Sequence, residues 1–247
     1  MKVYKLIYIF TVLYTIFAVN NSLLSQSRLE LSFNMGYSVP LLETYGTNVK
    51  LASDSASILV ADKRWLVSSN LGAEKGFTVQ TFLKYSFFKS GLIKGLLNLG
   101  YNVLSSSHPG PGDDYGVRVQ SFSIGIGPEI NPIGVKKFYP SLFAMLRVNF
   151  IGGETFFHAG LDFFKVVPRY GYAGGLKLNY KMNEKTGLYA GFIYSYDNTW
   201  NKQTEETAIK DAHVTSFRDK ASPTNGLTGD RRIAYSSYYI GMNFYLK

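Results

Sequence analysis

Cysteine is absent from this chain of 247 residues, and histidine occurs only three times. Without cysteine there is no disulfide, no thiol nucleophile and no thiolate metal site. The missing N-terminal cysteine also excludes the lipid anchor of a bacterial lipoprotein. The fold must therefore be held together by packing and hydrogen bonding alone.

Long apolar runs are also scarce. Residues 6–19 form a run broken only by Tyr and Thr, and Lys2 and Lys5 precede it. Fourteen residues are too few for a spanning helix but fit the core of a signal peptide, so the sequence predicts a cleaved signal peptide over residues 1–25. A retained helical anchor is disfavoured by the same length. No other stretch reaches about 18 apolar residues, so a membrane protein with this sequence must be built from strands.

Clusters of positive charge are missing, although the formal net charge is +9. The lysines and arginines are scattered singly, and no run of them predicts a nucleic-acid site. A mild positive excess is compatible with surroundings of anionic glycolipid in an outer membrane. The expected partners therefore include outer-membrane lipid and glycolipid, and no nucleic acid.

Alternating side chains are abundant, most clearly in residues 29–39. Every odd position there is apolar and every even position is polar or Gly, as in a strand with one apolar and one polar face. The stretch is eleven residues long, against about 5–6 for a usual strand, and is about the length that crosses a bilayer at a tilt. We interpret it as the first strand of an outer-membrane β-barrel, residues 26–247.

Seven further stretches show related alternation, less cleanly in some of them. They cover residues 76–88, 93–103, 116–128, 138–150, 168–181, 188–198 and 233–246. The connections alternate between long loops, at about 40–75, 105–115, 151–167 and 199–232, and short turns. Outer-membrane barrels separate their loops in this way, with short turns in the periplasm and longer loops outside. The predicted fold is all-β, an eight-stranded antiparallel up-and-down transmembrane β-barrel, with ten strands if residues 48–67 pair into the sheet.

The residue types indicate which face points outward. Along the predicted strand 168–181, one face runs from Tyr170 and Tyr172 through Leu176 and Leu178 to Tyr180, as two aromatic girdles around a hydrocarbon band would produce. The opposite faces of the strands are mostly Gly, Ser and Asn with isolated charges, whereas a solvated outer face is rich in long charged side chains. Small residues suit the narrow interior of an eight-stranded barrel. We therefore predict apolar side chains outside and polar ones inside.

The leader, the amphipathic strands, the alternating loop lengths and the aromatic-rich residues 238–245 together resemble the small outer-membrane barrels of the OmpA/OmpX type and the PorT-like barrels. The resemblance covers residues 27–247 and rests on patterns. It implies insertion by the barrel-assembly machinery, which reads a last strand that usually ends in Phe. This chain differs in ending with Phe244, Tyr245, Leu246 and Lys247. The PorT-like resemblance alone implies a secretion partner.

Seven charged residues fall on the polar faces: Glu30, Lys84, Arg147, Arg169, Lys177, Lys181 and Asp197. Because a buried charge needs a partner, we expect Glu30 to meet Lys181 or Lys177, and Asp197 to meet Arg169. An anion-favouring pore is one interpretation of these charges. A structural plug of salt bridges is favoured, because eight strands leave almost no channel.

Catalytic signals are weak. Some eight-stranded outer-membrane enzymes modify lipid A with a His beside a Ser and a carboxylate, but His158 is followed by Ala and Gly, and His108 and His213 lie in predicted loops. Asp113 and Asp114 could bind Ca²⁺, and Glu205 with Glu206, or Asp211 with His213, could bind a metal ion, but no spacing matches a known cage. The sequence therefore assigns no catalytic, cofactor-binding or metal-binding residue.

We accordingly expect a non-enzymatic protein of the cell outer membrane, acting in envelope structure, surface interaction or a secretion assembly. A lipid A-modifying enzyme is the second hypothesis and a small-solute pore the third.

Overall fold

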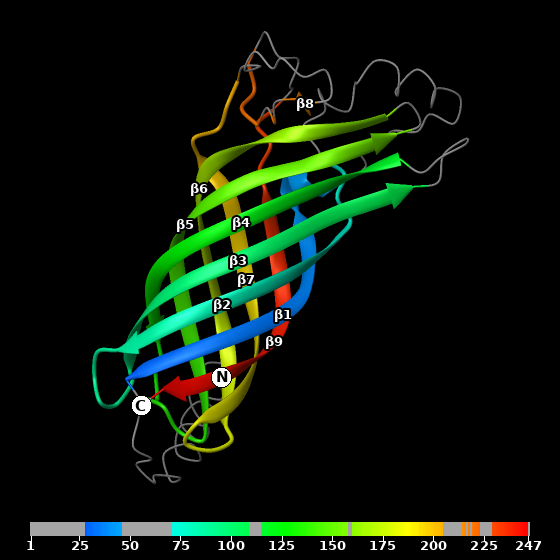
Figure 1. Ribbon diagram of the computed structural model, residues 1–247. Helices are drawn as coiled ribbons and strands as arrows, with labels where there is room; N and C mark the ends of the chain where they lie inside the picture. The colour runs from blue at the N-terminus through cyan, green and yellow to red at the C-terminus, as the bar shows by residue number, and fades with distance from the viewer. Residues whose placement is uncertain are drawn as a thin grey trace, which may run out of the picture.

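The computed structural model describes residues 28–45, 71–108, 115–157, 160–204, 214–215, 217, 219–222 and 229–246, and most of these lie in strands. Eight long strands follow one another along the chain (Figure 1): β1 (Leu29–Leu41), β2 (Lys75–Ser86), β3 (Ile93–His108), β4 (Tyr115–Ile130), β5 (Phe138–Phe157), β6 (Gly160–Lys181), β7 (Thr186–Trp200) and β9 (Ala234–Leu246). A 3-10 turn, η1 (Leu42–Thr44), and a two-residue strand, β8 (Val214–Thr215), complete the described elements. In this part of the chain, no helix has the length and apolar character needed to span a membrane.

The eight long strands close into a barrel. Each is antiparallel to its neighbours in the order β5-β4-β3-β2-β1-β9-β7-β6, and β6 returns to β5. Closure between the first and last strands runs from Leu29 opposite Leu246 to Leu41 opposite Ala234. Strand β8 stands outside this ring and pairs in parallel with β6 at Phe163 and Phe164. The prediction of an eight-stranded antiparallel up-and-down barrel is confirmed.

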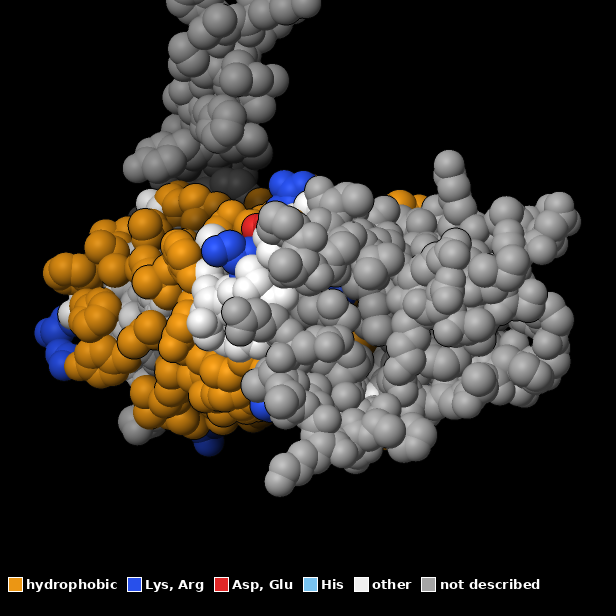
Figure 2. Space-filling model, turned by 90° about the horizontal axis from the view of Figure 1, so that it is seen from above, with side chains coloured by type: hydrophobic (Ala, Val, Ile, Leu, Met, Phe, Trp, Pro, Cys, Tyr) orange, Lys and Arg blue, Asp and Glu red, His pale blue; other side chains and the backbone are white. Residues whose placement is uncertain are grey.

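The two faces of each strand have opposite character. In β1, Phe33, Met35 and Tyr37 are exposed, whereas Ser32 and Ser38 are buried. Successive side chains of a strand point to opposite sides, so this pattern places apolar groups outside and polar groups inside. Hydrophobic side chains cover most of the described surface that is visible in Figure 2. The predicted orientation of the faces is therefore the one that the structure has.

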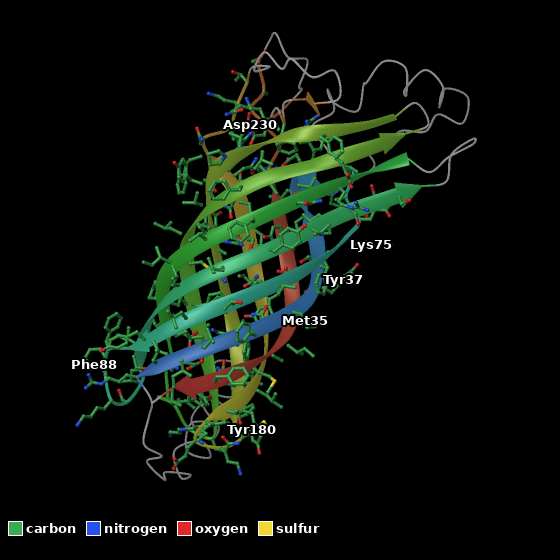
Figure 3. All side chains as sticks on the ribbon, in the orientation of Figure 1. Met35, Tyr37, Lys75, Phe88, Tyr180 and Asp230 are labelled. Carbon is green, nitrogen blue, oxygen red and sulfur yellow. The ribbon has the colours of Figure 1, made fainter. Side chains whose placement is uncertain are left out.

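The outer wall also has bands. On β6, Tyr170 and Tyr172 are exposed toward one end, Leu176 is exposed in the middle, and Tyr180 is exposed at the other end. The three short connections, residues 87–92, 131–137 and 182–185, all lie at the Tyr180 end, which we call the short-turn end. Figure 3 shows Phe88 and Tyr180 at this end and Asp230 at the opposite, long-loop end.

Strands β3 to β6 are longer than predicted. The loop expected over residues 151–167 is strand instead, since β5 runs to Phe157 and β6 begins at Gly160. A register shift between Ile151 and Gly153 marks a bulge, and a bulge moves successive residues out of the two-residue period. Gly153 has a φ of +153°, and a Cβ there would collide with the carbonyl oxygen of Arg118. The alternation is therefore lost although the pairing continues, which is why the sequence pattern indicated a loop.

The predicted loop 105–115 is shorter than expected, because β3 continues to His108 and β4 begins at Tyr115. Strands β3 to β6 together extend past the other strands at the long-loop end (Figure 1). The predicted signal peptide, residues 48–67, which would give ten strands if they paired into the sheet, and much of the loop 199–232 lie outside the described residues.

Candidate functional site: the barrel interior and its long-loop mouth

Two carboxylates and three ammonium groups meet inside the barrel near the short-turn end. The Nζ atoms of Lys84 and Lys94 lie 2.5 and 2.6 Å from the carboxylate oxygens of Glu30. Lys177 donates to Glu129, which also lies 3.6 Å from Lys84 and 3.9 Å from Lys94. All five side chains are at most 4% exposed. We call these residues, Glu30, Lys84, Lys94, Glu129 and Lys177, the lysine–glutamate cluster.

The expected partners of Glu30 were wrong. Glu30 pairs neither with Lys181 nor with Lys177, because Lys84 stands directly opposite it in the β1–β2 register and Lys94 lies on the next strand. Lys181 instead places its Nζ 5.1 Å from the centroid of the Tyr245 ring. The register between neighbouring strands determines which side chains meet inside a barrel, and the sequence alone did not give that register.

An apolar layer lies next to the lysine–glutamate cluster. Its buried members are Phe82, Leu96, Phe143, Met145, Ala173, Tyr189, Ile193 and Tyr239. Phe82 and Phe143 meet edge to face at 5.9 Å, and Nζ of Lys177 lies 4.9 and 4.7 Å from their ring centroids. Phe82, Phe143 and Met145 are buried on the inward faces of β2 and β5, among residues that are mostly polar.

Glycines on the facing strands make room for these rings. A Cβ on Gly191 would lie 2.7 Å from the Tyr239 ring, and a Cβ on Gly241 would lie 2.6 Å from the Tyr189 ring. The small inward-facing residues are therefore needed because large side chains fill the space beside them. The interior is a packed layer at this level.

A second ion pair lies on the long-loop side of the apolar layer. Nη1 of Arg147 lies 3.2 Å from Oδ1 of Asp197 and donates to the Ser195 hydroxyl at 2.8 Å. Oδ2 of Asp197 accepts hydrogen bonds from Ser121 at 2.7 Å and from Tyr235 at 3.1 Å. The expected pair of Asp197 with Arg169 is therefore wrong, and Arg147 takes that place.

Arg169 instead binds a segment of the β7–β9 connection. Its Nε and Nη2 atoms donate to the two carboxylate oxygens of Asp219 at 2.9 and 3.1 Å. Asp219 also accepts from Asn198 at 2.8 Å and from the backbone N–H of Gln203 at 2.8 Å. A charge-assisted bidentate pair of this kind is strong and directional. Asp219 therefore holds its own segment of the connection against β6 and β7 at the long-loop end.

The mouth is also closed by apolar side chains. A buried cluster contains Leu71, Ala73, Leu104, Val117, Val119, Ile151, Phe164, Phe217, Ile233 and Tyr235. It joins the extended parts of β3 to β6 to the two long connections, and Phe164 meets Phe217 edge to face at 5.2 Å. We call this group the mouth core. It gives the long-loop end a folded interior of its own.

An ion pair at the rim ties η1 to the segment before β9. Nε and Nη2 of Arg232 each lie 2.5 Å from a carboxylate oxygen of Glu43, and this hydrogen bonding holds the pKa of the Glu43 carboxyl below its ordinary value of 4.5. The lowered pKa means that the pair stabilises the fold above that ordinary value, and that the contribution is lost as the pH falls through the folded-state value.

We expect the wild type to lose more stability than Arg232→Gln between about pH 6 and pH 3. The difference should stay below about 1 kcal/mol, because the two side chains are 19% and 44% exposed and solvent screens the pair. Urea unfolding of both proteins at several pH values measures it. Equal pH dependence would mean that Arg232 does not influence the ionisation of Glu43.

Several interior charges were missed. Lys94 lies on the inward, even-numbered face of β3, so the alternation carried a signal for it. Glu129 was assigned to a turn because the strand was ended at residue 128, whereas β4 continues to Ile130. Asp219 and Arg231 are buried but lie outside the long strands, where no periodicity marks them.

The catalytic and metal hypotheses concern residues of which little is described. The side chains of His108, His158 and His213 lie outside the described part, as do Asp113, Asp114, Glu205, Glu206 and Asp211. Among the described residues, no group of three or more His, Asp or Glu side chains is arranged to hold a metal ion. These hypotheses stay untested.

No family model and no curated protein matches the chain. Among solved structures, Neisserial surface protein A (NspA) is 13% identical, with 89% of this chain and 98% of that chain covered and a TM-score of 0.48. Ail, the attachment invasion locus protein of Yersinia pestis, in complex with the heparin analogue sucrose octasulfate, is 11% identical, with 88% and 98% covered and a TM-score of 0.40. Values this low carry no functional argument, and the PorT-like resemblance gains no support.

Proposed function

We propose that the protein is an integral outer-membrane barrel without enzymatic activity, and that it presents the folded long-loop end for contact outside the cell. The observation that carries the proposal is the inverted polarity of a closed barrel. Its described outer wall is apolar, and its described interior holds ion pairs and amides.

The outer wall supports a membrane environment. Exposed aliphatic residues such as Ile126, Leu146 and Ile240 are 63–69% exposed. A large apolar surface is unfavourable in water. Exposed apolar patches of this kind therefore mark contact with a partner or a membrane. Bands of Tyr, Phe and Trp at both ends of the wall are typical of interface girdles. A ring of lipid around the barrel accounts for both features.

The packed interior argues against a solute pore. Three successive levels are filled, by the lysine–glutamate cluster, by the apolar layer and by Arg147 with Asp197, and the mouth core lies beyond them. Eight-stranded barrels are just wide enough for their own side chains. The charges inside therefore support the interpretation as a structural plug.

The long-loop end supports a surface role. The mouth core joins described parts of two connections to the extended sheet, so the described residues around it are held by a folded interior. A preorganised surface loses less entropy on binding than a flexible one. Envelope structure remains the simplest related role, and a role in a secretion assembly rests on the PorT-like resemblance alone.

The enzyme alternative has less support. Ser121 and Asp197 form a buried hydrogen bond, but Arg147 stands beside them where a hydrolase would need a general base. Mass spectrometry of lipid A from cells with and without the protein separates this alternative from the proposal.

We expect the purified protein to fold in lipid vesicles and to show heat-dependent mobility on gels. It should give no steady conductance in planar bilayers, because side chains fill the described levels of its interior. Protease digestion of intact cells should reach the long-loop connections before the short turns. A chain that stays monomeric in buffer without amphiphile would contradict the membrane location. A steady conductance would support the hypothesis of a small-solute pore.

A further inference from the structure

The short-turn end carries an unbalanced set of exposed charges. Four exposed basic residues lie there, Arg28, Lys89, Lys137 and Lys185, and we call them the basic collar. The only exposed acidic residue of the described short-turn end is Glu184. The collar draws on the start of β1 and on each of the three short connections, so the positive charge surrounds the barrel axis.

The long-loop end is different. There, Arg118 pairs with Glu154, Lys202 lies 3.2 Å from Asp230, and Arg232 pairs with Glu43. These acids neutralise the three bases that they pair with, and Lys75, Lys165 and Lys220 are also exposed at this end. Among the described residues, the basic collar has one exposed acidic neighbour, Glu184, for four bases, so most of its charge is left for an external anion.

Aromatic side chains fix the depth of the collar. Exposed Tyr85, Phe87, Phe88, Phe138 and Tyr180 form the girdle of the short-turn end, and Phe87 and Phe88 immediately precede Lys89 in the chain. Nζ of Lys137 lies 6.0 Å from the centroid of the Tyr180 ring. Girdle aromatics sit at the level of lipid headgroups, so the ammonium groups beside them lie within reach of headgroup phosphates. Figure 3 shows Phe88 and Tyr180 at this end.

We propose that the basic collar binds the headgroups of anionic phospholipids in the leaflet next to the short turns. The inference rests on the proposed membrane location. Phosphate is the chemical group in common among such lipids, and lysine binds it as a point charge. An anionic cell-wall polymer is a second class of partner, but it would not account for the aromatic girdle beside the lysines. The girdle favours lipid.

The test uses the full protein in phosphatidylcholine nanodiscs that contain a minor fraction of phosphatidylglycerol. Spin-labelled phosphatidylglycerol and phosphatidylcholine report which lipid is held at the protein surface. The triple variant Lys89→Gln, Lys137→Gln and Lys185→Gln removes three collar charges. The matched control Lys75→Gln, Lys165→Gln and Lys220→Gln removes three exposed charges from the long-loop end.

We expect the wild type and the control to prefer phosphatidylglycerol, and the collar variant to lose at least about fivefold of that preference, which is the effect of a single lysine near an anionic surface. The preference should also fall at about 1 M salt, where the Debye length is about 3 Å. Heat-dependent mobility establishes that each variant is folded.

Two results would overturn the inference: a collar variant that keeps the wild-type preference, or a control that loses it equally. The folded protein can also be tested for binding to isolated cell-wall sacculi. If that binding depends on the same three lysines and the lipid preference is unchanged in the collar variant, the basic collar binds the polymer and not lipid. If the wild type does not enter nanodiscs of either lipid, the proposed membrane location fails as well, whereas entry without preference removes the collar proposal alone.

Discussion

Replacing Glu129 with Gln should destabilise the barrel by about 3–5 kcal/mol, because it leaves buried positive charge without a partner. Among the described residues, Glu129 is the only carboxylate within 4 Å of the Lys177 ammonium group, whereas Lys84 and Lys94 also contact Glu30. The three ammonium groups would then share one carboxylate. Urea unfolding in phosphatidylcholine vesicles, followed by tryptophan fluorescence, measures the loss in free energy of unfolding.

A second substitution separates the charge effect from a loss of packing. Lys177→Met in the Glu129→Gln background removes the stranded ammonium and retains a flexible apolar chain beside Phe82 and Phe143. The double variant should therefore be more stable than Glu129→Gln alone. Lys177→Met alone should cost less than Glu129→Gln, since Glu129 still has Lys84 at 3.6 Å and Lys94 at 3.9 Å. A Glu129→Gln protein within about 0.5 kcal/mol of the wild type would mean that the cluster is hydrated and not dry.

The ion pairs show where sequence reasoning reached its limit. All seven charges placed on the inward faces are buried, because a two-residue period is a local property of the chain. Their partners were wrong for Glu30 and Asp197, because a pairing depends on the register between strands and on the tilt that closure imposes. Arg169 pairs with Asp219, which lies in a connection that has no periodic pattern.

The lengths of the strands followed the same logic. The first strand was predicted at residues 29–39, and the structure has it at Leu29–Leu41. The prediction is close because the alternation of this strand is unbroken. Strand β5 was predicted to end too early and β6 to begin too late, since the bulge at Ile151 and Gly153 interrupts the period without ending the pairing. The mouth core was not anticipated, because its members come from strand extensions and from connections that share no local pattern. Long-range contacts of this kind are absent from any window of sequence.

Leu178→Arg is the substitution that tests the membrane-facing wall most directly. Leu178 is 46% exposed on β6, between Leu176 and the girdle residue Tyr180, with Pro140 and Ala190 opposite it on the neighbouring strands. A guanidinium facing the bilayer midplane costs about 2–4 kcal/mol, whereas the same group near the interface costs about 0–1 kcal/mol. We expect Leu178→Arg to lower the free energy of unfolding by about 2–4 kcal/mol when unfolding is measured in vesicles.

Met182→Arg is the matched control, because Met182 is 51% exposed and follows β6 just beyond Tyr180. An arginine there reaches the headgroups, so its cost should be no more than about 1 kcal/mol. The difference between the two variants measures the depth gradient of the hydrocarbon and not the general effect of adding an arginine. If the two variants lose equal stability, or if neither loses any, the wall at Leu178 does not face lipid. The aliphatic band between the girdles would then need a protein partner to cover it.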